Sequence, residues 1–193
     1  MSAAAQSGTA ASRWAQIARR IRVPLGFIFA LAYLWLAQPT SVTICVGSVV
    51  VAIGLAVRAI ASGQLRKNED LAVSGPYSYT RNPLYLGSLL IGVGFALAAR
   101  NLWIWIFLLA MFAAIYVPVM ASEEAFLRAT FPDFESYARR VPRFLPRWSG
   151  ESLTAGFSRS LYIKHREYNA LLGAVLMMIA ITVKMLTTKS AGT

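Results

Sequence analysis

Long apolar segments separated by shorter polar stretches dominate this chain. Apolar residues fill positions 23–37, 42–61 (interrupted by Arg58), 84–99, 102–121 and 170–186. Several of these segments approach the roughly 20 residues that a helix needs to cross the hydrocarbon core of a bilayer. The pattern therefore predicts an all-α, polytopic membrane protein with about five transmembrane helices. The first and third segments are short, so we expect them to tilt little, to recruit flanking residues or, in one case, to be re-entrant.

The remaining stretches suggest three parts. Residues 1–22 predict a tail and a short helix lying in the headgroup layer, because apolar and basic positions alternate there at helical spacing. The core is predicted to span residues 23–148 and to consist of four helices and a cytoplasmic segment. Residues 149–193 predict a linker and a carboxyl-terminal transmembrane helix. We expect the first helix to act as a signal anchor rather than as part of a cleaved signal peptide.

The third and fourth apolar segments are joined by only Arg100 and Asn101. So short a connection predicts an antiparallel hairpin, whose other two ends must then be neighbours. The polar stretches 62–83 and 122–148 flank those two ends. The sequence therefore predicts that a cation, an amide, phenols and two carboxylates meet at one membrane surface.

Composition and charge agree with a membrane location. Hydrophobic residues make up 57% of the 193 residues, while charged residues make up 14%. The net charge of +11 is compatible with nucleic-acid binding, but only three of the 19 lysines and arginines, Arg100, Lys184 and Lys189, fall on one side of the predicted topology. This positive-inside pattern predicts a cytoplasmic amino terminus and two cytoplasmic loops. We therefore expect the lipid bilayer, and not nucleic acid, to be the partner; the oligomeric state stays open.

Metal and disulfide chemistry find little support in the sequence. The single Cys45 excludes an intramolecular disulfide and a metal site built from several cysteines. We expect no metal ligands. The single His165 stands in the polar stretch KHRE, which favours a surface position.

Two motifs carry the functional information. The stretch GPYSYTRNPLYLG at residues 75–87 is followed by EEAFLRATFPDFESYARRVPRFLP at residues 123–146. In this order and membrane context, the two motifs resemble the superfamily of integral-membrane isoprenylcysteine carboxyl methyltransferases and phospholipid methyltransferases. The resemblance covers roughly residues 60–148.

The resemblance implies methyl transfer from S-adenosyl-L-methionine to a lipid-like or small apolar acceptor, at a cofactor site open to the cytoplasm. Catalytic roles are implied for Arg81, Tyr85 and Glu123. The implied cofactor-binding residues are Gln64, Leu71, Tyr77, Asn82, Pro83, Leu84, Tyr85, Glu123 and Glu124. Adjacent helical residues point about 100° apart, so Glu123 and Glu124 cannot both face one pocket equally. The resemblance implies that Glu123 is the main cofactor contact, because it takes the position matched by the motif of the superfamily.

Two positions depart from the superfamily pattern. Asn82 stands where the motif most often has histidine, and Val119 stands where the carboxyl methyltransferases have a substrate-binding arginine. An amide can still donate and accept hydrogen bonds, whereas valine cannot hold an acidic substrate. A carboxylate, an amine and a thiol all remain possible acceptors.

Other interpretations stay open at this point. Tyr77 and Tyr85 also fit a belt of interfacial aromatic residues, and Gly92 and Gly94 fit helix packing better than cofactor binding. A sterol-type membrane reductase using NADPH and a non-catalytic membrane scaffold are the rival functions. The size of the chain favours a prokaryotic cytoplasmic membrane.

Overall fold

The computed structural model describes residues 17, 24–66 and 70–190. The expected headgroup-layer helix therefore lies outside the described residues, apart from Ile17. Within the described part of the chain all regular structure is helical. The elements are Pro24–Leu36, α2 (Ser41–Ser62), α3 (Pro76–Tyr79), α4 (Pro83–Ala99), α5 (Leu102–Met111), the π-helix η1 (Phe112–Tyr116), α6 (Val117–Thr130), α7 (Phe134–Arg140), α8 (Arg159–Lys164) and α9 (Tyr168–Ser190).

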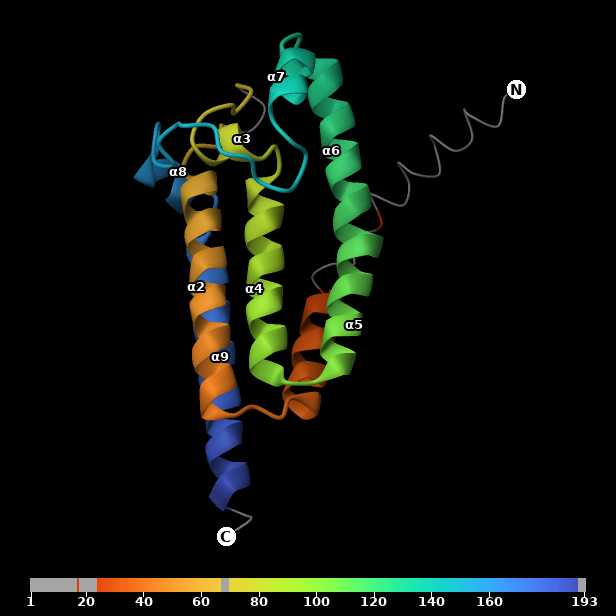
Figure 1. Ribbon diagram of the computed structural model, residues 1–193, viewed down its shortest axis with the longest axis vertical. Coiled ribbons are helices and arrows are strands. Elements are labelled where there is room, and N and C mark those ends of the chain that lie inside the picture. The colour runs from red at the N-terminus through yellow and green to blue at the C-terminus, as the bar shows by residue number, and fades with distance from the viewer. Residues whose placement is uncertain (1–16, 18–23, 67–69, 191–193) are drawn as a thin grey trace, which may run out of the picture.

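The long helices stand side by side, and the short ones gather at one end of the bundle (Figure 1). We call the end that carries α3, α7 and α8 the site end. The opposite end, called the far end, holds the turn before α2, the turn between α4 and α5, and the carboxyl-terminal end of α9. The predicted hairpin of residues 84–121 is confirmed, because α4 and α5 are antiparallel and joined by Arg100 and Asn101.

Three helices among the described residues are long and apolar enough to cross a membrane: Ser41–Ser62, the continuous helix Leu102–Thr130, and Tyr168–Ser190. Pro24–Leu36 and Pro83–Ala99 are apolar but shorter. The membrane character expected from the sequence thus holds for three helices, and crossing by the other two stays a prediction.

Helices α2 and α4 pack with their backbones in contact. A Cβ atom added at Gly94 would lie 2.6 Å from the carbonyl oxygen of Gly47, and one added at Gly54 would lie 2.7 Å from that of Gly87. Such glycine pairs let two membrane helices approach closely, with dispersion and polar contacts in place of a hydrophobic driving force. Gly94 is therefore a packing residue, as the sequence favoured, and Gly92 likewise packs against Leu108 of α5.

The helix Leu102–Thr130 contains a π-helical turn just before Pro118. Proline has no N–H to donate to the carbonyl four residues earlier and its ring crowds that carbonyl, so regular α-helical bonding fails there. A wider turn relieves the conflict and often marks a functional site. Here it sets Tyr116 against Tyr85 of α4, with ring centroids 5.7 Å apart.

Polar contacts close the far end of the bundle. The ammonium group of Lys184 donates to the carbonyls of Leu34, Trp35 and Ala37, at distances of 2.6 to 2.9 Å. These carbonyls belong to the end of the helix Pro24–Leu36, where a cation is favourable. Asn101 holds the same end by donating to the carbonyl of Leu36. Together these contacts tie the helix Pro24–Leu36 and α9 to the hairpin.

Candidate functional site

A cavity of about 990 Å³ lies at the site end of the bundle. Its walls come from α2, the start of α4, η1, α6, α7 and the turn before α9, together with residues 70–72 and Tyr77 of α3. The sequence-predicted residues that line it are Leu71, Tyr77, Arg81, Asn82, Pro83, Leu84, Tyr85, Glu123 and Glu124. The expected convergence of the two polar stretches is therefore observed, whereas the cofactor roles of these residues stay predictions.

Gln64 is the one predicted residue that does not line the cavity. Its side-chain amide donates to the carbonyl of Leu153 at 2.9 Å. It also fills the space beside Gly75, where φ is +57° and an added Cβ would come within 2.1 Å of the Gln64 side-chain oxygen. Gln64 thus packs against Gly75 at the start of α3, and it does not line the cavity.

The segment of residues 141–148, which we call the strap, runs beside the start of α4. Backbone hydrogen bonds join Arg81 N–H to the carbonyl of Pro142 and Arg147 N–H to the carbonyl of Tyr79, at 2.9 and 3.0 Å. The hydroxyl of buried Thr80 donates to the carbonyl of Phe144 at 2.9 Å. The start of the RNPLY motif is therefore held in place by the strap, which lies more than 60 residues further along the chain.

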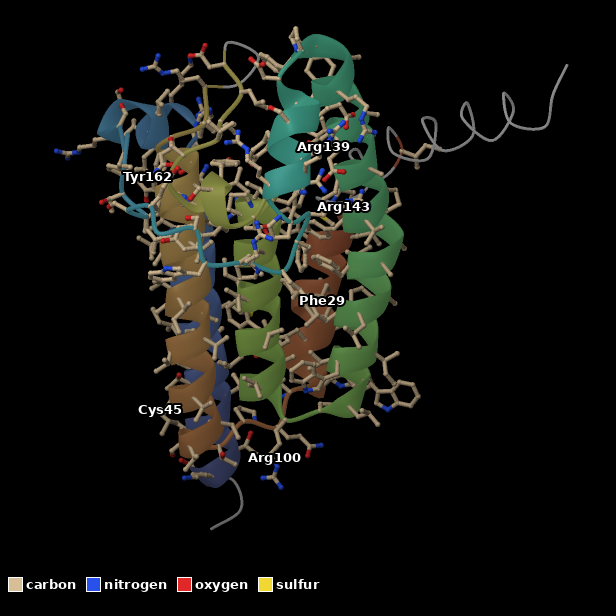
Figure 2. The ribbon with its side chains drawn as sticks, turned by 45° about the horizontal axis from the view of Figure 1, so that its top comes forward. Phe29, Cys45, Arg100, Arg139, Arg143 and Tyr162 are labelled. Carbon is tan, nitrogen blue, oxygen red and sulfur yellow. The ribbon has the colours of Figure 1, made fainter. Side chains whose placement is uncertain are left out.

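Glu124 is the centre of a charged cluster between α4, α6 and the strap. The amide of Asn82 donates to one of its carboxylate oxygens at 3.1 Å, and Arg81 lies 3.5 Å from the same oxygen. Arg143, labelled in Figure 2, lies 3.3 Å from the other oxygen. Asn82 also donates to the backbone carbonyl of Arg143 at 2.9 Å, so Glu124 and Asn82 together connect the strap to the cavity wall.

Glu123 and Tyr77 line the cavity from two different helices, α6 and α3. Burial raises the pKa of Tyr77 well above its usual range, and the nearby Tyr137 and Glu123 raise it further. The Tyr77 hydroxyl is buried and has no hydrogen-bond partner, and the same is true of the Nε of Arg81. A buried polar group without a partner is costly, so these two atoms mark places where a ligand would be stabilising.

The apolar part of the site comes from α4, η1 and α6. Tyr85 packs against buried Ile115 and Val119. Val119 is only 3% exposed and belongs to this cluster, so it gives the cavity no polar group at the position where the carboxyl methyltransferases have arginine.

Sequence reasoning missed a second charged group in the cavity wall. Arg58 of α2 forms a two-point ion pair with Glu167, with nitrogen–oxygen distances of 3.0 and 2.7 Å. Arg58 also donates to Ser88 and to the carbonyl of Leu84 on α4. The signal was present, because Arg58 interrupts an otherwise apolar segment, but its partner lies 109 residues away.

The prediction that His165 is a surface residue is wrong. His165 is half-buried, lines the cavity, and has its Nδ1 atom 3.0 Å from the carbonyl oxygen of Ser62 at the end of α2. Packing of the turn between α8 and α9 against the end of α2 places it there. Local polarity around KHRE could not indicate this contact.

The charges that line the cavity are nearly balanced. Every lining arginine has a lining carboxylate as partner: Arg58 with Glu167, Arg66 with Asp70, and Arg81 with Glu124. Glu123 is a fourth lining carboxylate. Among the described residues, and with histidine neutral, four lining carboxylates thus stand against three lining arginines and Arg143 beside Glu124, so the site carries no excess positive charge that would favour an anionic occupant. Among the described residues, no group of three or more His, Cys, Asp or Glu could hold a metal ion.

Known proteins share parts of this sequence. The family model described as phospholipid methyltransferase matches residues 40–133. The chain is 44% identical over 90 residues, 45% of its length, to the cobalt-zinc-cadmium resistance protein CzcN of Cupriavidus metallidurans. It is 37% identical over 100 residues, 52% of its length, to the nickel-cobalt-cadmium resistance protein NccN of Alcaligenes xylosoxydans xylosoxydans. The chain covers only 42% and 45% of these two relatives, and no solved structure matches it.

Proposed function

We propose that this chain, whose residues 40–133 are a phospholipid methyltransferase family domain, transfers a methyl group from S-adenosyl-L-methionine to an acceptor that enters from the bilayer. The domain lies within the isoprenylcysteine and phospholipid methyltransferase superfamily. One observation carries the proposal. Residues from both motifs, more than 30 positions apart in the sequence, surround a single cavity beside helices that are apolar enough to cross a membrane.

The cavity fits the methyl donor in size, charge and hydrogen bonding. Its volume, about 990 Å³, falls at the upper end of the roughly 300–1,000 Å³ typical of small-molecule sites. The carboxylate of Glu123 in the wall suits a cationic sulfonium compound. The orphaned Tyr77 hydroxyl and Arg81 Nε provide two donors for the polar groups of a ligand.

The residues divide into polar and apolar roles. Glu123 is the proposed acceptor of hydrogen bonds from ribose hydroxyls or from the amino group of the donor, and Arg81 the proposed contact for its carboxylate. The proposed apolar surface for the adenine ring of the donor consists of Leu71, Pro83 and Leu84. The bound donor supplies an activated methyl group on a positively charged sulfur.

The protein's contribution to such a reaction is alignment and exclusion of water. An in-line displacement with an activated leaving group needs the two reactants held in line, and a dry cavity prevents competing hydrolysis. The aromatic cluster of Tyr85, Tyr116 and Phe112 is the proposed apolar wall that keeps water from the acceptor, since its rings pack at centroid distances of 5.4 and 5.7 Å.

Titration calorimetry of the full chain in detergent, with S-adenosylhomocysteine and separately with NADPH, tests the proposal. We expect S-adenosylhomocysteine to bind and NADPH not to bind. Binding of NADPH alone would favour the reductase, and binding of neither would favour the scaffold.

Glu123→Gln is the matched variant for this experiment. The loss of a charge-assisted hydrogen bond in a partly dehydrated site costs about 1.5–3 kcal/mol, which is roughly a tenfold to hundredfold loss of affinity for S-adenosylhomocysteine. Glu151→Gln, at an exposed position outside the cavity, is the control and should leave the affinity unchanged. Equal affinity of the Glu123→Gln variant and the unmodified chain would remove Glu123 from the site.

A further inference from the structure

His165 is the one histidine of the chain, and it lines the cavity without having any role in the function proposed above. It ends α8 and precedes the turn into α9. The side chain is half-buried. An imidazole in a cavity wall is a candidate for proton transfer, because histidine is the side chain best suited to exchange protons near neutral pH.

The contact with Ser62 determines which ring nitrogen carries the proton. Nδ1 lies 3.0 Å from the backbone carbonyl oxygen of Ser62, and a carbonyl oxygen can only accept a hydrogen bond. Nδ1 must therefore be the donor. In the neutral ring the lone pair then resides on Nε2, which is free to accept a proton.

The charged groups around the cavity are largely engaged with one another. Both carboxylate oxygens of Glu167 are bound by Arg58, and both oxygens of Glu124 have cationic or amide partners. The titratable and charged groups that line the cavity with His165 are Arg58, Arg66, Asp70, Tyr77, Arg81, Tyr85, Tyr116, Glu123, Glu124, Tyr137 and Glu167. Burial raises the pKa values of Tyr77 and Tyr137 far above neutrality, so neither phenol is a base at pH 7.

We propose that Nε2 of His165 is the general base for methyl transfer, and that the acceptor is therefore a thiol or an amine rather than a carboxylate. This inference rests on the methyltransferase function proposed above. A thiol or an ammonium group must lose a proton to react, whereas a carboxylate is already ionised at neutral pH. The pairing of each lining arginine with a carboxylate also leaves no excess positive charge for an acidic acceptor.

The step balances in atoms and charge. The acceptor gives its proton to Nε2, and a lone pair on its sulfur or nitrogen forms the new bond to the methyl carbon. The bond from that carbon to the sulfonium sulfur breaks, and its electron pair stays on the sulfur as a neutral thioether. With a thiol, the positive charge that the donor loses is then carried by the imidazolium of His165. With an ammonium group, the imidazolium carries the charge of that group, and the charge of the donor ends on the methylated ammonium product. In both cases the proton then passes from Nε2 to water.

Nuclear magnetic resonance of the single histidine tests the tautomer without any activity assay. The full chain, purified through a tag that contains no histidine, is labelled with ¹⁵N-histidine and titrated in detergent. We expect Nδ1 to remain protonated in the neutral ring and Nε2 to be the nitrogen that titrates. A neutral ring protonated at Nε2 would overturn the proposal.

The variant His165→Asn separates the base from its structural contact. Asparagine keeps a donor close to the position of Nδ1 for the Ser62 carbonyl, but it has no basic nitrogen. With small thiols and with lipid amines as probes, we expect the methylation rate at pH 7 to fall about 10²–10⁴-fold. The loss should shrink as rising pH deprotonates the acceptor directly, and affinity for S-adenosylhomocysteine should stay within about twofold.

Lys164→Asn is the control, because Lys164 is the exposed neighbour of His165 and does not line the cavity. An unchanged rate and pH profile in His165→Asn, or efficient turnover of a carboxylate acceptor by the unmodified chain, would contradict the inference while leaving methyl transfer intact. Failure of the unmodified chain to bind S-adenosylhomocysteine would instead contradict the proposed function itself.

Discussion

Glu123 and Glu124 are adjacent in the chain, yet α6 turns them toward different surroundings. Glu124 is held by Asn82, Arg81 and Arg143, so its carboxylate is committed to joining α4 to the strap. Glu123 lies close enough to Tyr77 to raise the pKa of that phenol. This difference supports the expectation that Glu123 is the main ligand contact, and it gives Glu124 a positioning role instead.

Glu124→Gln should therefore act first on stability. The substitution removes the charge that balances Arg81 and Arg143, while the amide keeps the shape of the side chain. We expect a loss of about 1–3 kcal/mol in the free energy of unfolding, because both side chains are largely buried and Arg81 would lose its charged partner. Thermal unfolding in detergent measures the loss.

The control for this variant is Glu135→Gln. Glu135 pairs with Arg128, but both side chains are more than half exposed, so the pair contributes little. A stability loss as large in Glu135→Gln as in Glu124→Gln would show that burial of the Glu124 cluster has no special importance.

Asn82 shows how a residue can line a site and also build it. The sequence suggested an amide that replaces a histidine in contact with the cofactor. In the structure the amide nitrogen donates to Glu124 and to the carbonyl of Arg143. Weak cofactor binding by a variant at Asn82 would thus reflect a displaced strap as well as any lost contact with the ligand.

At the scale of helices, the α2–α4 contact determines the shape of the cavity wall. Arg58 follows Gly54 by one turn on α2, and an added Cβ at Gly87 would lie 2.6 Å from the Arg58 side chain. The close approach of the two backbones is what lets Arg58 reach both Ser88 and the carbonyl of Leu84. The packing of two apolar helices thereby positions a charged group in the site.

Gly94→Ala should disturb this contact. The new methyl group would meet the Gly47 carbonyl oxygen at 2.6 Å and the Val51 backbone nitrogen at 2.7 Å, and backbone atoms cannot move aside cheaply. Overpacking of this kind costs about 1–3 kcal/mol, so the midpoint of thermal unfolding should fall.

Gly173→Ala on α9 is the matched control, since nothing lies within 4 Å of the added atom. Alanine is the better helix former, so this variant should be neutral or slightly more stable. If both variants unfold at the same temperature, α2 and α4 are not in contact through Gly47 and Gly94.

At the scale of the whole molecule, charge and structure agree on two distinct ends. Arg139 of α7 and Arg143 of the strap lie at the site end, whereas Arg100 lies at the far end (Figure 2). The positive-inside rule then predicts that the site end lies in the cytoplasm. We propose that all five apolar helices cross the membrane, with the cavity open to the cytoplasm of a bacterial cell.

Cysteine labelling tests this orientation. In a Cys45→Ala background, Ser152→Cys at the site end should react with an impermeant maleimide only from the cytoplasmic side, and Gln38→Cys only from the outside. Both native side chains are exposed, so each substitution should leave the fold intact. Labelling of Gln38→Cys from the cytoplasmic side would contradict the proposed topology.

The sequence by itself determined the membrane class, the α4–α5 hairpin and the meeting of the two motifs. Each follows from a local property, because apolar length indicates a span and a two-residue connection forces neighbouring helices to be antiparallel. The same local reasoning named most of the residues that line the cavity, since these stand at the ends of the paired helices.

Only the tertiary structure decided what α9 and the strap contribute. Ser62 and His165 are separated by 103 positions, and Arg58 and Glu167 by 109, so no periodicity or local motif links them. The choice between Glu123 and Glu124 likewise depends on where the strap places Arg143. Such contacts result from packing between distant segments, which is why His165 was expected on the surface and why it lies in the wall of the cavity.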